Sequence, residues 1–400
     1  MATKVKLILD LGNSETRGIV LVDCPDGTMK ERSFEISNRF AIVSPDYKLP
    51  ADYTADTSMH FKMDYELDGK SATCYAIHGD AIREDLSAVV RPESTHIKKY
   101  NNITTPLSFG ASVLRASNIV MDILNVPLNQ LDIEWIVTAL LPPADVKDGA
   151  GKLHTLFKSI TEIEYFLPNF KMAVNVANAM VLPEAYCAFI GTVLGRGAYV
   201  NQGMENLQKE MVLVVDIGAG TTDQLIVENN SPISSTMNTC NIGGNNVTQR
   251  VRLAVTKNLG FRPDEESVNK AMLTGKIKDG SREIDITEYI NKAKDEVAGM
   301  IEKEIRDFFE MTTFPIRNIN KLLVCGGGSL SGNSNTNIKS MGDSLITYLK
   351  QRAPYIELVA TPTRTITKVD ANGVSQQQQE NISPRVLNVL GASILVEGNN

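Results

Sequence analysis

Two short stretches of the chain show the same order of apolar and polar residues. Residues 7–21 read LILDLGNSETRGIVL and residues 213–227 read LVVDIGAGTTDQLIV. Aligned without a gap, they share Leu, Asp, Gly and Thr at matching positions, and apolar residues precede the Asp and follow the turn in both. An apolar run, a Gly-containing turn and a second apolar run predict a β-hairpin. The repeat therefore predicts two related lobes, each offering one hairpin turn to a shared ligand.

Other segments alternate between predicted strands and predicted helices. Residues 132–141 and 321–325 are apolar runs of strand length, and residues 287–309 place apolar residues at helical spacing. An apolar helix is expected from Glu184 onward, because Pro183 suits a helix N-terminus. This alternation predicts the α/β class.

The predicted lobes divide the chain near residue 182. Lobe I comprises residues 1–182 and the C-terminal helix 386–400, whose Gly391-Ala392 pair is small enough for close packing against the first lobe. Lobe II comprises residues 183–385. Insertions are expected at about 34–105 in lobe I, where the sequence is irregular, and at about 260–286 in lobe II. The polar run 368–383 predicts a solvated loop.

Length and composition narrow the class of protein. The chain has 400 residues, which exceeds the size of about 250–300 residues at which a single core stops growing. The apolar share of 42% and the charged share of 22% exclude disordered and fibrous chains. A net charge of -7 argues against a protein that coats DNA through its own charge.

Patterns for zinc binding and for membrane insertion are missing from the sequence. The five Cys and four His residues are scattered, so no zinc site is predicted. No apolar run approaches the roughly 20 residues that a membrane span needs, and Asp10 interrupts the first apolar stretch. We therefore expect a cytoplasmic protein without a signal peptide.

The two turns carry residue types that bind phosphate. Backbone N–H groups in a Gly-rich turn form a concave site for phosphate oxygens, and Gly removes the Cβ that would block close approach. Asp10 and Asp216 lie at the strand ends, where they repel phosphate but suit Mg²⁺ held through its water shell. The turns therefore predict a clamp for a Mg-triphosphate, formed by Gly12, Gly218 and Gly220 with Ser14, Thr221, Thr222 and Arg17.

Three other features have both a structural and a functional interpretation. Glu184, in the first turn of an apolar helix, either stabilises the helix dipole or acts on the ligand. Gly243 and Gly244 either form a turn and a helix cap or contact the ligand. The GGGS run at 326–329 is either a mobile turn or a loop on which a purine or ribose lies. A P-loop is not predicted at 69–71, because Asp64 stands where its first Gly should be.

Five segments, in order, resemble the actin/Hsp70/sugar-kinase superfamily of ATPases. Residues 10–17 and 216–223 are similar to its two phosphate loops, 183–184 and 391–392 to its connecting helices, and 325–329 to its adenosine loop. Arg17 stands where that superfamily usually has Lys. The chain length and the stretches 135–142, 242–244 and 283–329 are most similar to bacterial actin-like ATPases of the ParM type, which segregate plasmids. No N-terminal amphipathic membrane helix is visible, which weighs against the MreB and FtsA types.

This resemblance implies an actin-like two-lobe α/β fold, with duplicated ribonuclease-H-like domains and a nucleotide cleft between the lobes. Glu184 would orient or deprotonate the attacking water, and Asp10 and Asp216 would hold the hydration shell of Mg²⁺. The implied cofactors are ATP or GTP together with Mg²⁺. The implied nucleotide-binding residues are Gly12, Asn13, Ser14, Arg17, Gly218, Ala219, Gly220, Thr221, Thr222, Gly243, Gly244, Gly326, Gly327, Gly328 and Ser329.

The resemblance also implies partners. Nucleotide binding would favour head-to-tail filaments of the chain with itself, and hydrolysis would weaken them. A DNA-bound adaptor protein would connect the filament to a plasmid, with neither direct DNA binding nor membrane contact. The alternative is a non-polymerising small-molecule kinase or a nucleotide-binding scaffold of the same fold. The absence of a long sugar-binding insertion favours the filament over the kinase.

Overall fold

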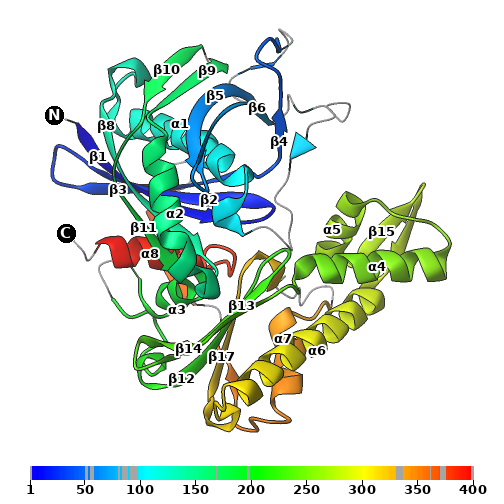
Figure 1. The fold of residues 1–400 in the computed structure, drawn as a ribbon. Coiled ribbons are helices and arrows are strands. Elements are labelled where there is room, and N and C mark those ends of the chain that lie inside the picture. The colour runs from blue at the N-terminus through cyan, green and yellow to red at the C-terminus, as the bar shows by residue number, and fades with distance from the viewer. Residues whose placement is uncertain are drawn as a thin grey trace. The chain divides into compact units, whose positions relative to one another are not determined.

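The computed structural model describes residues 2–49, 53–54, 58–79, 82, 89–90, 98–167, 169–195, 199–329, 337–360, 362–369 and 375–397. Contacts divide the chain into two compact units, Met1–Pro183 (unit 1) and Glu184–Asn400 (unit 2). Figure 1 draws unit 1 in blue to green and unit 2 in green to red. The boundary predicted from the sequence lies one residue earlier.

The main sheet of unit 1 has five strands in the order β11-β8-β1-β2-β3. β1 pairs in parallel with β8, and β8 with β11, whereas β1, β2 and β3 form an antiparallel meander. The apolar runs of β1 and β8 are buried on both faces, as is usual for parallel strands. The strands are β1 (Thr3–Leu11), β2 (Glu15–Asp23), β3 (Met29–Ser37), β8 (Ile133–Leu141) and β11 (Asn175–Pro183).

A second sheet of unit 1 has six strands in the order β10-β9-β5-β6-β4-β7. Most of it comes from the segment 34–105, and the expectation that this segment is irregular is wrong for its described part. Phe61, Met63 and Tyr65 are buried with more exposed polar residues between them, which is the period-two pattern of a half-buried strand. The strands are β4 (Phe40–Ile42), β5 (Ser58–Leu67), β6 (Lys70–Gly79), β7 (Val89–Val90), β9 (Glu162–Leu167) and β10 (Phe170–Ala173).

Two helices of unit 1 pack against these sheets. α1 (Thr104–Leu124) contacts β2 and β3, and α2 (Val146–Ser159) contacts β11. α1 has the length and composition of a membrane span, contrary to the expectation from the sequence, but 67% of its most apolar window is buried inside the protein. Its buried residues, among them Leu107 and Phe109, belong to the hydrophobic core of unit 1. Burial in that core is the packing expected of a core helix.

The sheet of unit 2 repeats the main sheet of unit 1. Its order is β14-β13-β12-β17-β18, with β12, β17 and β18 parallel and β12, β13 and β14 antiparallel. Strand for strand, β12, β13, β14, β17 and β18 therefore match β1, β2, β3, β8 and β11. The hairpin repeat in the sequence is thus part of a repeat of whole sheets. The strands are β12 (Met211–Ile217), β13 (Thr222–Glu228), β14 (Ser231–Cys240), β17 (Lys321–Cys325) and β18 (Glu357–Leu358).

Helices cover both faces of the unit 2 sheet. Alternate residues of β12 belong to two different core clusters, because neighbouring side chains point to opposite faces. Val212 and Val214 pack with α3 (Glu184–Val193) and α8 (Leu387–Glu397). Leu213, Val215 and Ile217 point to the opposite face. They pack with α4 (Gly244–Leu259), α6 (Thr287–Met311) and α7 (Met341–Leu349).

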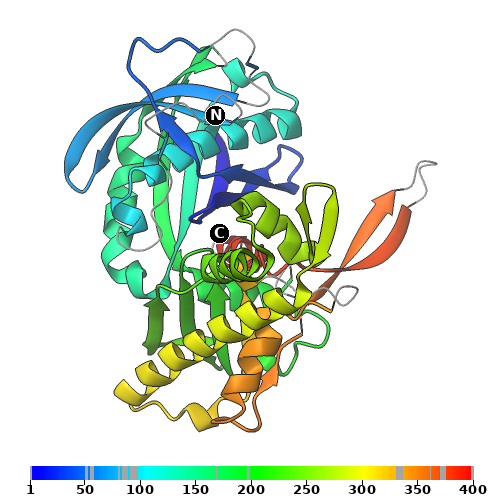
Figure 2. The ribbon, with the colours of Figure 1, turned by 90° about the vertical axis from the view of Figure 1, so that its right-hand side faces the viewer.

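The residues between α4 and α6 form a small substructure. It consists of α5 (Glu265–Thr274) and a hairpin of β15 (Lys276–Asp279) and β16 (Arg282–Asp285). These elements occupy the segment expected as the insertion of lobe II. A second hairpin, β19 (Thr363–Val369) with β20 (Ser375–Asn381), is drawn as an orange-red ribbon in Figure 2. The sequence predicts a loop at 368–383, and the paired backbone of β20 corrects this.

The C-terminal helix α8 packs on α3 and thus within unit 2, whereas the sequence assigns it to lobe I. A Cβ atom at Gly391 would lie 1.8 Å from the carbonyl oxygen of Cys187, and one at Gly191 would lie 2.2 Å from that of Leu387. The backbones of the two helices are therefore in direct contact at these glycines. The Gly391-Ala392 pair, which the sequence predicts to pack closely on the first lobe, therefore packs on α3.

Candidate functional site

The first predicted phosphate turn joins β1 to β2. Asp10 lies opposite Arg17, and Leu11 lies opposite Thr16, so Gly12, Asn13 and Ser14 form the connection. Asp10 is only 5% exposed. A Cβ atom at Gly12 would lie 2.5 Å from the carbonyl oxygen of Glu15, so the turn has no room for a side chain at this position.

Arg17 lies among carboxylates on this hairpin. Its guanidinium is 3.6 Å from the Asp10 carboxylate and 3.7 Å from that of Glu35, and it also pairs with Glu15. Arg17 is 9% exposed and Asp10 is 5% exposed, so this pair interacts largely away from water, whereas the Glu35 side chain is 49% exposed. The sequence predicts that Arg17 binds a phosphate. Such a phosphate would have to compete with the carboxylates of Asp10, Glu15 and Glu35 for the guanidinium.

Asn38 holds the first turn in place and was missed by sequence reasoning. Its Oδ1 atom accepts hydrogen bonds from the hydroxyls of Thr16 and Ser108, each at 2.8 Å, and its Nδ2 donates to the carbonyl of Gly12. The backbone N–H of Asn38 donates to the carbonyl of Ser14 at 2.9 Å. This side chain thereby joins the turn, β2 and α1. The sequence repeat gives a signal for Asn38. Asn38 follows the third strand of the meander in unit 1, and Ile242 occupies the corresponding place in unit 2.

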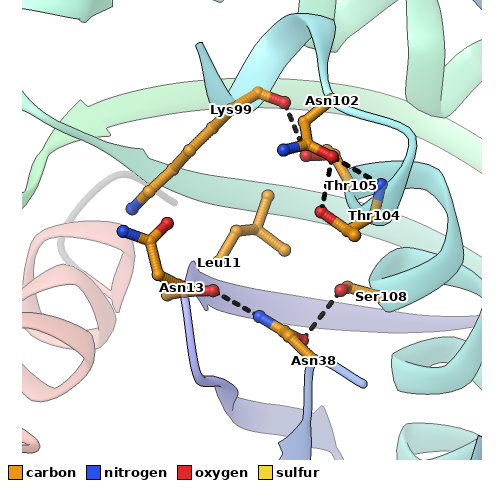
Figure 3. A pocket seen from close by; sticks show the side chains of 9 residues that line it. Leu11, Asn13, Asn38, Lys99, Asn102, Thr104, Thr105 and Ser108 are labelled. Atoms are coloured by element: carbon orange, nitrogen blue, oxygen red, sulfur yellow. Dashed lines mark hydrogen bonds between the residues drawn. The ribbon is translucent and has the colours of Figure 1, made fainter. Parts of the chain in front are cut away.

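A small polar pocket lies beside the first turn (Figure 3). Its volume is about 260 Å³ including space open to solvent, and its lining includes Gly12, Asn13, Asn38, Lys99, Asn102 and Ser108. The side chains of Asn13 and Lys99 point toward one another in Figure 3. At the start of α1, the Oδ1 atom of Asn102 accepts from the N–H and the hydroxyl of Thr104 at 3.0 and 2.9 Å. The enclosed part of this polar pocket has room for about one water molecule.

The second predicted phosphate turn joins β12 to β13 with the same register. Asp216 lies opposite Asp223, and Ile217 lies opposite Thr222. The N–H of Gly218 donates to the carbonyl of Thr221 at 2.8 Å, which closes the turn. The Thr222 hydroxyl donates to the carbonyl of Ile242 at 2.6 Å. Thr222 thus fastens the segment that follows β14 beside the turn, as Thr16 fastens Asn38 after β3.

Gly243 and Gly244 bring the N-terminus of α4 against the second turn. The N–H groups of Gly244 and Asn245 donate to the carbonyls of Gly218 and Ala219 at 2.9 and 2.8 Å. The N–H of Gly243 donates to the side chain of Asn246 at 2.8 Å, which caps the helix. These contacts support the interpretation of Gly243 and Gly244 as a turn and a helix cap. They also fix the second turn against the N-terminus of α4.

The glycines after β17 pack on the end of β12. Gly326 has a φ of +86°, and a Cβ atom there would lie 2.0 Å from the Asp216 carboxylate. A Cβ atom at Gly328 would lie 2.1 Å from the carbonyl oxygen of Gly218. The loop is therefore a tightly packed turn, and residues Gly327–Ser329 form a short 3-10 helix. The side chain of Ser329 lies outside the described residues.

Three buried carboxylates surround the carboxyl end of β17. Glu184 is the first residue of α3, and Glu184, Asp216 and Asp223 are 6%, 4% and 2% exposed. Burial raises the pKa of the Cys325 thiol well above its usual value, and the negative charges of Asp216, Asp223 and Glu184 raise that pKa further. The Asp223 carboxylate accepts a hydrogen bond from the Thr239 hydroxyl at 2.5 Å. Glu184 and Asp216 thus both lie near Cys325 in unit 2.

Comparisons with known proteins agree with this topology. Residues 214–334 match the family model described as archaeal actin homologue MreB-like, C-terminal. No curated protein matches the sequence at a significant level. Among solved structures, the actin-like protein Alp7A aligns over 100% of this chain and 97% of its own, with a TM-score of 0.66 and 14% identity.

Two further structures align over nearly the whole length of both chains. The archaeal actin homologue Ta0583 in complex with ADP covers 99% of this chain and 100% of its own, with a TM-score of 0.61 and 14% identity. A 15-stranded ParM filament from Clostridium botulinum covers 100% of both chains, with a TM-score of 0.59 and 16% identity. This chain has the actin-like fold.

Within this actin-like fold, the predicted site residues fall into two sets. Asp10, Gly12, Asn13, Ser14 and Arg17 lie at the tip of the β1–β2 hairpin of unit 1. The second set lies in unit 2, around the ends of β12 and β17. Its members are Glu184, Asp216, Gly218, Ala219, Gly220, Thr221, Thr222, Gly243, Gly244, Gly326, Gly327, Gly328 and Ser329.

Proposed function

We propose that this chain is a nucleotide-dependent, filament-forming actin-like ATPase of the ParM type. The observation that carries the proposal is the repeated sheet with its two turns, each with a buried Asp at the strand end and a Thr that fastens the following segment. Such paired turns suit a ligand with several phosphates. Nucleotide binding is supported by the relative that was solved with ADP, and self-association by the relative that was solved as a filament.

The residues of both turns fit a Mg-nucleotide. In unit 1, Gly12 has no room for a Cβ atom and lies two residues after the buried Asp10. In unit 2, Gly326 likewise has no room for a Cβ atom and lies against the buried Asp216. Among the described residues, no group of three or more His, Cys, Asp or Glu side chains could hold a metal ion by itself. Asp10 and Asp216 would hold Mg²⁺ through its water shell together with phosphate oxygens, because this ion gives up its water ligands reluctantly. When bound, the ion supplies positive charge to the phosphates.

Glu184 is the residue proposed to act on water. It is buried at the first turn of α3, and its charge, like that of Asp216, raises the pKa of the Cys325 thiol. In phosphoryl transfer the protein contributes mainly position and charge stabilisation, so the task of this carboxylate is to orient the water and accept its proton. The N–H groups of Gly218, Gly244 and Asn245 donate within the turn and the helix cap, so the backbone N–H groups of Ala219 and Gly220 and the hydroxyl of Thr221 would bind the phosphates.

The cellular role proposed is segregation of plasmid DNA. The net charge of -7 disfavours direct contact with DNA, so a DNA-bound adaptor protein would connect the filament to its cargo in the cytoplasm. The nucleotide proposed to be bound and hydrolysed is ATP or GTP. A heterologous, head-to-tail contact that does not close on itself produces such a filament.

The test is polymerisation with Mg-ATP and Mg-GTP, followed by light scattering and electron microscopy together with phosphate release. We expect filaments that form with nucleotide and shorten as phosphate is released. A chain that stays monomeric at high concentration with both nucleotides refutes the proposal. Transfer of phosphate to an added metabolite without filaments would identify the small-molecule kinase instead.

A further inference from the structure

The short 3-10 helix η1 (Lys99–Asn101), which precedes α1, lies beside the first phosphate turn. Lys99 is partly exposed and lines the small polar pocket together with Gly12 and Asn13 of that turn. In Figure 3 the side chain of Lys99 extends from η1 toward Asn13, and the side chain of Asn13 points back toward Lys99. Unit 1 therefore places a cation beside the turn that the sequence predicts to bind phosphate.

Arg17, the cation that the sequence assigns to this phosphate, is held by carboxylates. Its guanidinium lies 3.6 Å from the Asp10 carboxylate and 3.7 Å from that of Glu35, and it also pairs with Glu15. Three carboxylates and one guanidinium together carry an excess of negative charge. A phosphate bound at the turn would therefore gain more from a cation outside this cluster.

Contacts with α2 fix the position of η1. The ammonium of Lys98 lies 2.7 Å from the carboxylate of Asp145, the residue that precedes α2. Lys152, on α2, donates to the side chain of Asn101 at 3.1 Å, and its ammonium lies 5.1 Å from the centroid of the buried Tyr100 ring. The residues on both sides of the lysine in η1 are thus tied to α2 or to its first residues.

The start of α1 fixes the backbone of Lys99 itself. Its carbonyl oxygen accepts hydrogen bonds from the Thr105 hydroxyl at 2.5 Å and from the N–H of Asn102 at 3.2 Å. The Asn102 side chain in turn accepts from the N–H and the hydroxyl of Thr104. Because this backbone is already ordered, a ligand held by Lys99 would have to order only the side chain, which lowers the entropy cost of binding.

We propose that the ammonium group of Lys99 binds a phosphate oxygen of the nucleotide at the first turn. It would supply the positive charge that Arg17, held in its carboxylate cluster, does not supply there. Lysine binds phosphate as a point charge, and hydrogen bonds between charged groups are about twice as strong as neutral ones. The inference rests on the proposed nucleotide binding and extends that site to a residue outside both turns.

The experiment titrates the full chain with mant-ATP, a fluorescent ATP analogue, in the presence of Mg²⁺ and at a protein concentration too low for polymerisation. Lys99→Met removes the charge and keeps most of the side-chain length. It should weaken binding about 10- to 100-fold, the range expected for the loss of one hydrogen bond between charged groups. Lys99→Gln, a second neutral variant, should agree with it. Lys99→Arg should restore most of the lost affinity, because the charge returns.

The neighbouring Lys98 provides the matched control. Lys98→Met makes the same change in net charge one residue away, but this side chain is 54% exposed and pairs with Asp145. It should change the dissociation constant less than about twofold, because exposed ion pairs contribute little and long-range attraction is screened by salt. The urea midpoint of the Trp135 fluorescence checks that unit 1 stays folded in each variant.

The outcomes separate this inference from the proposed function. If Lys99→Met and Lys98→Met bind mant-ATP equally well, Lys99 makes no direct contact with phosphate and the inference is overturned, while nucleotide binding by the wild type stands. The same titrations use mant-GTP if the wild type binds that nucleotide more tightly. If the wild type binds neither analogue, the proposed function and the role of Lys99 are overturned together.

Discussion

The crossing of α3 and α8 allows a quantitative prediction for Gly391→Ala. The added Cβ would lie 1.8 Å from the carbonyl oxygen of Cys187 and 2.6 Å from the N atom of Gly191. Carbon and carbonyl oxygen normally approach to about 3.3 Å, so the helices must separate by about 1.5 Å. Overpacking of this kind costs about 1–3 kcal/mol, and we expect the upper end because the obstacle is backbone on both sides.

The assay is urea unfolding with two probes. Far-UV circular dichroism reports on the whole chain, and fluorescence of Trp135, the single Trp of the sequence, reports on unit 1. Gly391→Ala should lower the midpoint of the circular dichroism transition, with the larger effect on the part that comes from unit 2. Unfolding of a chain with two units need not be two-state, so midpoints for the two probes are compared separately.

A second glycine serves as the matched control. Gly151 also lies in a helix, α2, but a Cβ atom there would meet nothing within 4 Å. Gly151→Ala should therefore stabilise unit 1 by about 0.5–1 kcal/mol, because Ala has the higher helix propensity. The reasoning is refuted if Gly391→Ala unfolds at the wild-type urea concentration or above, since the close backbone contact would then not constrain the crossing.

Further predictions concern the site and a buried lysine. Glu184→Gln should slow phosphate release on the order of 100-fold or more while filaments with Mg-ATP still form; an unchanged rate would remove Glu184 from the mechanism. Asn38→Ala should destabilise unit 1 by about 1–3 kcal/mol in the Trp135 transition, because Gly12, Thr16 and Ser108 lose their shared partner; an unaltered midpoint would contradict the role given to this network. Burial lowers the pKa of Lys294 from 10.5 to about 8, so the unfolded chain binds the proton more tightly. Between pH 8 and 10.5 the wild type should therefore gain stability relative to Lys294→Met as pH rises, by about 3 kcal/mol in total. Parallel pH profiles for the two proteins would show that this lysine does not titrate as stated.

The hairpin repeat could be predicted from the sequence because its information is local. Apolar runs, Asp at the strand end and Gly in the turn recur at the same offsets in 7–21 and 213–227, and the registers of both hairpins agree with that alignment. The actin-like fold followed from the order of such segments and is confirmed by the solved relatives.

The predictions that failed depend on contacts between distant segments. The strand β5 contains polar residues at its more exposed positions, so its sequence has few apolar residues in a row and resembles an irregular segment. The assignment of α8 to lobe I is wrong. The small residues Gly391 and Ala392 predict close packing, but they do not identify the partner element, which is α3. The repeat marks the segment of Asn38 after the third strand, but it does not reveal the partner Ser108, which lies 70 positions away along the chain.

The two halves of the repeat fasten their turns with different atoms, and this affects how each position tolerates substitution over evolutionary time. The acceptor for Thr222 is the main-chain carbonyl of residue 242, which every amino acid supplies. The acceptor for Thr16 is the side chain of Asn38, which few residues can replace. Relatives of this chain should therefore vary freely at the position of Ile242, within the limits of its packing, and hardly at all at that of Asn38.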